Sequence, residues 1–300
     1  MSILNTASDG LYNVLIVLCG VLDKEGGTEK DKLINICSNK EDASVLKIRQ
    51  TLLRWTQLGL FVENNGVVDF GNHPNTNKIN LRKKGEIMKY LPVFCRQFIF
   101  SEDNNKNFWD SENSKAADIN RALSWILAQN IYNFSLHKNV EIQKIESKQL
   151  NDNKKRLVQN STRLNGLKNW APYLGFTSTV NNMIVDPTRA IIQESEIIFE
   201  EGAEYVVNDF LRTLAGKLPV LDGGTYRQRV EEVLDPRHWQ KPPSPEMLST
   251  SLSRALWRLE LAGIIELETR SDADANRLIQ RQGGQQLKSF THVIYRGDGQ

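Results

Sequence analysis

One short pattern occurs three times in this chain: an amphipathic helical segment, a glycine, and then an apolar segment that favours a strand. A tryptophan lies a turn or so before each glycine, at Trp55, Trp170 and Trp257. Glycine readily takes the positive φ that ends a helix. The three helical segments end on Leu58-Gly59-Leu60, Leu174-Gly175-Phe176 and Ala262-Gly263-Ile264. A helix that ends in this way and turns into a hairpin is the second half of a winged helix-turn-helix.

The first copy predicts the whole order of such a module. Helices are expected over Gly10–Leu22, from Thr28 to Cys37, and over Ser44–Leu58, where apolar residues recur every three or four positions. Asn64-Asn65-Gly66 supplies the positive-φ residues of a tight hairpin between Leu60–Glu63 and Val67–Phe70. We therefore expect a mainly α fold with small β-hairpins (α+β), built from tandem winged helix-turn-helix modules.

The rest of the chain suggests three domains. Residues 1–100 would form an N-terminal winged helix with a trailing helix, and 191–300 a C-terminal winged helix with a long wing loop. Residues 101–190 would be helical, with a second, less regular winged-helix-like unit. The middle part should hold a long helix over Ala116–Leu136 and a helix over Asn153–Leu174. The last wing should pair Ile264–Thr269 with Ser289–Arg296 across a loop, Arg270–Lys288.

Composition limits the environment of the chain. The 300 residues carry a formal net charge of +2, so a nucleic-acid surface must come from local segregation of charge. The longest apolar stretch, Leu11–Val21, is too short to span a bilayer. Cys19, Cys37 and Cys95 are widely spaced in apolar surroundings, which favours buried thiols in a reducing compartment. We expect a cytoplasmic protein with no membrane partner.

Such segregation occurs on the three predicted helices. Acidic residues number 36 in 300, yet none occurs in Ala43–Val62, Asn153–Val185 or Met247–Leu259. Cations suit phosphates, while amides and hydroxyls suit base edges. The candidate DNA-binding residues on these helices are Lys47, Gln50, Thr51, Arg54, Gln57, Lys155, Arg163, Lys168, Arg254 and Arg258.

Each of these features has a plainer interpretation. The residues from Lys47 to Gln57 should form the exposed face of the first helix, but a solvated helix face is polar by default and Lys and Arg are good helix formers. Trp257 lies off the apolar stripe, so it either packs in the core or faces another module or a partner. An acidic cluster is either a solvated face or a dock for a basic partner: Glu194, Glu196, Glu200, Glu201 and Glu204.

The sequence offers little support for catalysis. The four histidines are far apart, and no His or Cys has a partner at the spacing of metal ligands. No phosphate-binding loop of the Walker type and no GxSxG nucleophile elbow is present. We therefore expect no catalytic residues, no metal and no small-molecule cofactor, although an active site assembled from distant residues would leave no such signal.

The middle copy carries a resemblance to a known family. Trp170-Ala-Pro-Tyr-Leu-Gly-Phe, a short hairpin, and then Val185-Asp-Pro-Thr-Arg-Ala190 resemble the central signature of the DpdG family. The overall length and the amino-terminal winged helix fit as well. The resemblance implies membership of bacterial gene clusters that insert 7-deazaguanine derivatives into DNA and restrict unmodified invaders. It implies a role on the restriction side beside helicase-like (ATPase) and nuclease-like partners, and it supplies no catalytic residues.

These observations leave several functions open. The first is a non-catalytic tandem winged-helix subunit that binds double-stranded DNA, bridges partners, or does both in a phage-defence or restriction complex. The second is a protein-interaction scaffold without DNA binding, which the near-neutral charge and the acidic cluster favour. A transcription regulator fits three modules less well, and an enzyme ranks last.

Overall fold

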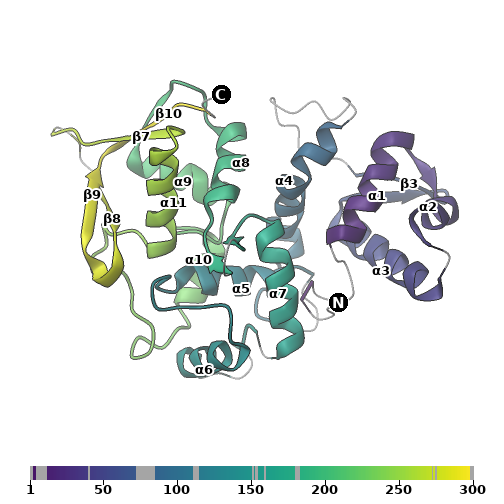
Figure 1. Ribbon diagram of the computed structural model, residues 1–300, viewed down its shortest axis with the longest axis horizontal. Helices are drawn as coiled ribbons and strands as arrows, with labels where there is room; N and C mark the ends of the chain where they lie inside the picture. Colours follow the sequence, from purple (N-terminus) through teal and green to yellow (C-terminus); the bar gives the residue numbers. More distant parts are fainter. Residues whose placement is uncertain are drawn as a thin grey trace. The chain divides into compact units, whose positions relative to one another are not determined.

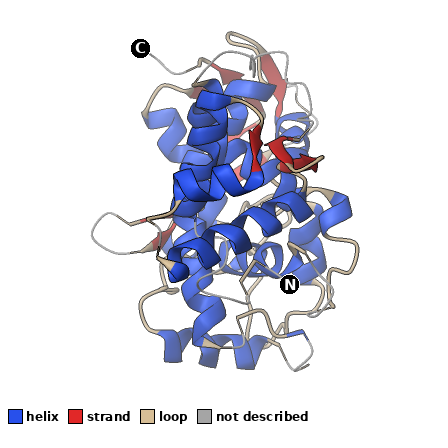
Figure 2. Ribbon diagram, turned by 90° about the vertical axis from the view of Figure 1, so that its right-hand side faces the viewer, coloured by secondary structure: helices blue, strands red, loops and turns tan. Residues whose placement is uncertain are grey.

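In the computed structural model the chain is about half helical, with small antiparallel sheets, which confirms the mixed α+β class (Figure 1; Figure 2). The structure describes residues 3–4, 12–39, 41–71, 85–110, 115–150, 152, 155–158, 160–179, 183–271, 273 and 276–297. The chain divides into two compact units, one of Met1–Ile119 with Thr162–Leu174 and one of Asn120–Ser161 with Gly175–Gln300. The three predicted domain boundaries stay a prediction.

The first unit is built around helix α1, which packs against three other helices, α2, α3 and α4. In chain order its elements are α1 (Tyr12–Glu25), β1 (Thr28–Glu29), α2 (Lys30–Cys37), α3 (Asp42–Leu58), β2 (Phe61–Asn64), β3 (Val67–Phe70), α4 (Glu86–Phe100), η1 (Glu102–Asn104) and α7 (Ser161–Tyr173). The buried faces of α1 and α3 carry Leu15, Leu18, Ile48, Leu52 and Trp55, so Trp55 is a core residue. The expected order of three helices followed by a hairpin is present.

A tight turn closes the hairpin of the first unit. Asn65 and Gly66 have φ of 50° and 78°, the positive values that a two-residue hairpin turn of type I′ requires. Strand β3 pairs antiparallel with β2, from Phe61 opposite Phe70 to Asn64 opposite Val67. It also pairs with β1, so the three strands lie in the order β1-β3-β2.

The second unit repeats this sheet order. Its elements are α5 (Ala117–Ala128), which begins in the first unit, α6 (Asn139–Gln149), β4 (Thr177–Ser178), β5 (Ile184–Val185), α8 (Thr188–Ile198), β6 (Glu204–Val206), α9 (Val207–Lys217), α10 (Thr225–Glu231), α11 (Thr250–Leu261), β7 (Ile265–Glu268), β8 (Arg277–Gln280), η3 (Gln282–Gly284), β9 (Gln286–Phe290) and β10 (His292–Tyr295). Strand β10 pairs antiparallel with both β6 and β7, in the order β6-β10-β7. In both units the last strand of the sheet therefore lies between the other two.

The predicted loop over Arg270–Lys288 is wrong over most of its described length. It contains the antiparallel hairpin of β8 and β9, and β8 packs against α11. Ile279 and Phe290 are buried on this hairpin, so its apolar residues cover α11 instead of facing solvent. The expected wing strands β7 and β10 are present on either side of it.

All three predicted helix ends occur at glycines with positive φ. Gly59, Gly175 and Gly263 have φ of 101°, 86° and 71°, and a strand follows each of them within a few residues. The middle copy is nevertheless divided, because α7 belongs to the first unit and the hairpin β4–β5 to the second. The predicted start of its helix at Asn153 is wrong: helix α7 begins at Ser161, and the buried Glu146 carboxylate accepts hydrogen bonds from the backbone N–H groups of Leu157 and Val158.

The long helix predicted over Ala116–Leu136 ends at Ala128 as α5. The last carbonyl groups of a helix need donors from outside it. Here Ser251 Oγ donates to Leu127 O at 2.7 Å, and Trp239 Nε1 donates to Ala128 O at 3.0 Å. Both donors come from distant parts of the same unit, so the helix stops where tertiary partners replace its own next turn.

An ion pair with one buried partner joins the residue before α8 to α11 in the second unit. Asp186, whose side chain is 3% exposed, precedes α8 and pairs with Arg258 of α11, whose side chain is 49% exposed. The Asp186 carboxylate also accepts from the backbone N–H of Thr188 at 3.1 Å, so it supports the start of α8. The pair holds α8 against α11.

Two further expectations concern the cysteines and the membrane. Cys19 and Cys95 are buried free thiols and Cys37 is half-buried, which agrees with small apolar side chains in a core. Burial raises the pKa of the Cys37 thiol to about 11, so this thiol stays protonated at neutral pH. Within the described ranges, no helix is both long enough and apolar enough to cross a bilayer.

Substitution of two of the helix-ending glycines should give unequal losses of stability. Gly263→Ala places a Cβ in open space. The free energy of unfolding should therefore fall only by the cost of holding alanine in the left-handed conformation, about 1–2 kcal/mol. Gly175→Ala places a Cβ 2.7 Å from the backbone N of Ala190, which adds an overpacking cost of about 1–3 kcal/mol. Urea unfolding of both variants measures the difference, and equal losses would contradict the close approach of Gly175 to α8.

The ion pair of Asp186 predicts a second contrast. Removing one partner of a buried pair costs about 3–5 kcal/mol, and because Arg258 is half-exposed we expect Arg258→Ala to lower the free energy of unfolding by about 2 kcal/mol. The matched control is Arg296→Ala, which removes a 2.6 Å pair with Glu266 whose side chains are both 49% exposed. That variant should stay within about 0.5 kcal/mol of the parent in the same urea titration.

Candidate nucleic-acid interface

The structure presents only part of the predicted face of α3. Lys47 and Gln57 are exposed and Gln50 is half-buried. Thr51 and Arg54 are buried, so the expectation that they lie on the exposed face of this helix is wrong. The sequence held a signal for Thr51, which lies three residues after Ile48 and four before Trp55 and therefore shares their face.

Packing from distant segments explains the burial on α3. Trp55, the neighbour of Arg54, packs against Trp170 of α7 with ring centroids 5.6 Å apart. Asn104 Nδ2 donates to the Leu58 carbonyl at 2.9 Å, at the end of the same helix. The C-terminal half of α3 is thus covered inside the first unit by chain that is far away in sequence.

The residues that α3 does expose are a mixture of cations and apolar side chains. Arg49, which the sequence analysis missed, is exposed and lies 3.6 Å from Asp31. Leu46 and Leu53 are 56% and 54% exposed, seven residues apart on one face. Large apolar side chains with this exposure are more typical of a protein-binding face than of a helix that reads DNA.

The predicted basic residues around α7 do not form an exposed row. Arg163 is buried, while Lys155 and Lys168 are half-buried, and their contact with DNA stays a prediction. Burial lowers the pKa of the Lys168 ammonium, because desolvation disfavours its charged form. The acid-free run in this part of the sequence therefore does not produce a basic surface on α7.

The two predicted cations of α11, Arg254 and Arg258, have different surroundings. Arg258 is exposed but pairs with the buried Asp186 carboxylate, so it has a structural partner. Arg254 is half-buried and lines a groove of about 270 Å³ between α11 and the β8–β9 hairpin. Within the described ranges, the Arg254 guanidinium has no hydrogen-bond or ion-pair partner.

This space, which we call the α11 groove, combines cations with aromatic rings. Arg281 comes to it from the turn of the hairpin, and among the described residues its guanidinium also lacks a partner. Trp257 is half-buried here, so the tryptophan off the apolar stripe faces a groove. The other side chains that line it are Tyr132, Ser253, Ile279, Gln280, Gln282 and Leu287.

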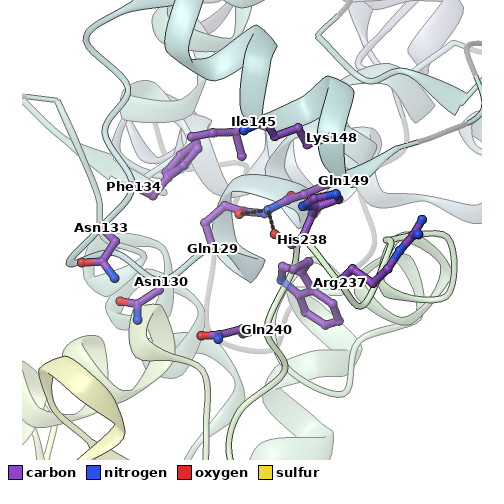
Figure 3. A pocket seen from close by; sticks show the side chains of 11 residues that line it. Gln129, Asn130, Asn133, Phe134, Ile145, Lys148, Gln149, Arg237, His238 and Gln240 are labelled. Carbon is purple, nitrogen blue, oxygen red and sulfur yellow. Dashed lines mark hydrogen bonds between the residues drawn. The ribbon is translucent and has the colours of Figure 1, made fainter.

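Two further cavities of the second unit adjoin this region. One, of about 410 Å³, is lined largely by amides and is called here the amide cavity (Figure 3). The other, of about 210 Å³, shares Gln129, Asn130, Asn133 and Gln240 with the amide cavity and Gln280 with the α11 groove. The amide cavity is lined by Gln129, Asn130, Asn133, Phe134, Ile145, Lys148, Gln149, Arg237, His238, Trp239 and Gln240.

The charge of this combined surface has one sign. Among the described residues that line the three cavities, none is an aspartate or glutamate. The basic ones are Lys148, Arg237, Lys241, Arg254 and Arg281, and of these Arg237 is paired with the Asp235 carboxylate at 2.6 Å. Cations beside aromatic rings and amides are the chemistry of nucleic-acid contact, because they can meet phosphates, base faces and base edges.

Of the candidate DNA-binding residues that the sequence predicts, Arg254 is the one that lines this surface. The loop at 129–134 lay inside a predicted helix, and Arg281 lay inside a predicted loop. The segment 237–241 belongs to a proline-rich stretch, residues 235–246, which we call the connector. The available signal was the density of amides in Gln129-Asn130 and at Asn133. Tertiary contacts bring these segments together, among them the capping of α5 by residues of α11 and the connector and the bond from Ile131 N to Thr250 Oγ1.

The acidic cluster does not form a uniform free surface. Glu194 is buried, and Glu204 accepts two hydrogen bonds of 2.6 Å from Arg270. The Arg270 guanidinium lowers the pKa of the Glu204 carboxyl, which keeps this pair charged at neutral pH. Glu194 and Glu204 are therefore not free carboxylates, and a dock for a basic partner stays a prediction.

The comparisons with known proteins identify a family. In the part of the chain that the structure describes, no three His, Cys, Asp or Glu side chains come close enough to hold a metal ion. No curated protein and no solved structure matches the chain. The model of the DpdG-like family matches residues 1–273, which ends before β8. The chain therefore belongs to the DpdG-like family, and this membership points to a role in the 7-deazaguanine DNA modification system.

Proposed function

We propose that this chain is a non-catalytic subunit that binds double-stranded DNA and bridges partner proteins in a bacterial restriction complex of the 7-deazaguanine type. Membership of the DpdG-like family supports the DNA-modification context. The partners would be helicase-like or nuclease-like components of the same system. The proposal assigns no catalytic residue, cofactor or metal to the chain.

Two winged helices form the framework of the proposal. Each would consist of a first helix, a short strand, further helices, a glycine-ended helix and two more strands. Residues 12–70 and 188–295 follow this order, and in both the last strand lies between the other two. The middle copy would not be a third module, because its helix and its two-stranded hairpin belong to different units.

The α11 groove is the proposed DNA surface. In a winged helix the last helix and the wing are the parts that approach DNA. Arg254 comes from this helix and Arg281 from the hairpin inserted into the wing, and neither guanidinium has a partner among the described residues. Unpaired cations on an acid-free surface are available for phosphates, and this is the observation that carries the proposal.

A second function, protein interaction through the first unit, has its own support. On α3 the exposed pair Leu46 and Leu53 occupies the position where the first winged helix would meet DNA. Ile36 of α2 adds a third exposed apolar side chain, 49% exposed. The two candidate functions therefore belong to different units, and one chain can perform both.

The DNA-binding proposal predicts a large effect of two substitutions. Arg254→Glu with Arg281→Glu should weaken binding to a fluorescently labelled duplex by about tenfold or more, since two phosphate contacts become repulsive. The slope of log K against log salt should become less steep by about 1.8, that is about 0.9 for each lost contact. Fluorescence anisotropy at several salt concentrations measures both quantities.

A control of equal charge separates local contact from bulk electrostatics. Arg212→Glu with Lys217→Glu makes the same change in net charge on exposed positions of α9. This variant should retain most of the affinity. Equal weakening by both double variants, or unchanged affinity of the Arg254 and Arg281 variant, would contradict the assignment of the α11 groove.

The interaction proposal predicts loss of partners from a change on α3. Leu46→Ser with Leu53→Ser should reduce the proteins that co-purify with the tagged chain from its native host, while duplex affinity stays within about twofold. Leu261→Ser, at a leucine that is 69% exposed on α11, is the control for general apolar stickiness. Retention of the same partners by the Leu46 and Leu53 variant would exclude this face as the interface.

A further inference from the structure

The amide cavity has a chemistry that neither winged helix explains. Its volume of about 410 Å³ falls within the range of about 300–1,000 Å³ typical of small-molecule sites. Among the described residues that line it, side-chain amides are the most frequent group and no carboxylate is present. Such a cavity suits a neutral ligand with both hydrogen-bond donors and acceptors.

A hydrogen-bonded network fixes the floor of the cavity. Gln149 Nε2 donates to Gln129 Oε1 at 2.9 Å and to the His238 carbonyl at 3.2 Å, as Figure 3 shows. Gln149 Oε1 accepts from Trp125 Nε1 at 2.8 Å, and Gln129 Nε2 donates to the Trp125 carbonyl at 3.0 Å. These bonds hold both buried amides in one orientation, and a fixed amide presents a fixed pattern to a ligand.

Two amides at the rim of the cavity form no hydrogen bond with other described residues. The side chains of Asn133 and Gln240 are exposed and, among the described residues, form no hydrogen bond. The Oδ1 atom of Asn130 accepts from the Tyr132 backbone N–H at 3.1 Å, which turns this side chain toward its own loop. In Figure 3 these three residues lie on the same side of the cavity. An Asn or Gln amide can bond two adjacent atoms of a base edge.

Aromatic and basic side chains complete the site. Phe134 packs edge-on against Trp125 with ring centroids 5.5 Å apart, which holds its ring at the wall. Trp239 is buried and its Nε1 donates a hydrogen bond to Ala128 O. A ligand in the cavity can therefore contact this residue through its ring. Lys148 is exposed at the mouth, where a cation can meet a phosphate. A site with aromatic rings for base stacking, amides for hydrogen bonds to a base edge and a cation at its mouth for a phosphate is suited to a nucleotide.

We propose that the amide cavity binds a single unstacked nucleobase of DNA, with Asn133 and Gln240 bonded to its edge. This inference rests on the proposed function, because the DNA that carries the base is held by the adjoining α11 groove. A base turned out of a duplex exposes the edge and faces that such a cavity contacts, and an unpaired base needs the least energy to leave the stack. A cationic ligand is disfavoured by the absence of carboxylates among the described lining residues.

The test compares two duplexes that differ in one base. Each carries a single-nucleotide bulge, which is an unpaired deoxyguanosine in one and an abasic residue in the other. Wild-type protein should bind the first about tenfold more tightly, as stacking and edge bonds to one base imply. Asn133→Ala with Gln240→Ala should reduce this ratio to about one. Both residues are exposed, so folding of the variant should be unaffected.

Two controls separate the inference from the proposed function. Asn208→Ala with Gln286→Ala removes two exposed amides outside the cavity and should keep the tenfold ratio. Arg254→Glu with Arg281→Glu should weaken both duplexes alike and also keep the ratio. A wild-type ratio near one, or a ratio unchanged in the Asn133 and Gln240 variant, would overturn the base cavity alone. Binding to neither duplex at low salt would overturn the DNA-binding function and the cavity with it.

Discussion

The second unit depends on the capping of the C-terminal carbonyl groups of helix α5 by distant side chains. Ser251 and Trp239 donate to its last carbonyls, and Ser249 at the start of α11 bonds the Asp222 carboxylate through both its backbone N–H and its hydroxyl at 2.6 Å. A helix end inside a core must satisfy its carbonyls or lose stability. The same contacts place the loop after α5 beside the connector and α11. The amide cavity and the α11 groove both result from this capping.

The two proposed winged helices share a sheet order but differ in the surface of their last helix. In the first unit, packing of Trp55 against Trp170 covers part of α3, and Leu46 and Leu53 remain exposed. In the second, the inserted hairpin covers an apolar part of α11 and brings Arg281 beside Arg254. One framework can therefore serve two kinds of partner, because binding depends on the side chains that each last helix leaves uncovered.

Local chemistry explains which features were predictable. Asn65-Gly66 adopts the positive φ values of a tight hairpin turn at little energetic cost. A glycine that follows an amphipathic helix ends that helix. The bounds predicted for these elements therefore lie close to the observed ones. The exposure of single residues was less predictable. Arg54 is buried although the polar residues around it predicted an exposed face, and Arg163 is buried although it lies in a run of 33 residues without an acid, from Asn153 to Val185. Charge patterns describe composition along the chain, whereas burial depends on contacts across it.

The sequence by itself determined the three helix ends at Gly59, Gly175 and Gly263, the Asn65-Gly66 turn, the mixed α+β class and the family, since each depends on residues close together in the chain or on a linear motif. Tertiary structure decided the end of α5 at Ala128, the β8–β9 hairpin and the partner of Arg258. It also assembled the amide cavity from segments about 100 residues apart, around Gln129 and Gln240. Hydrogen bonds and buried area between distant segments set these features, and no local pattern encodes which segments will meet.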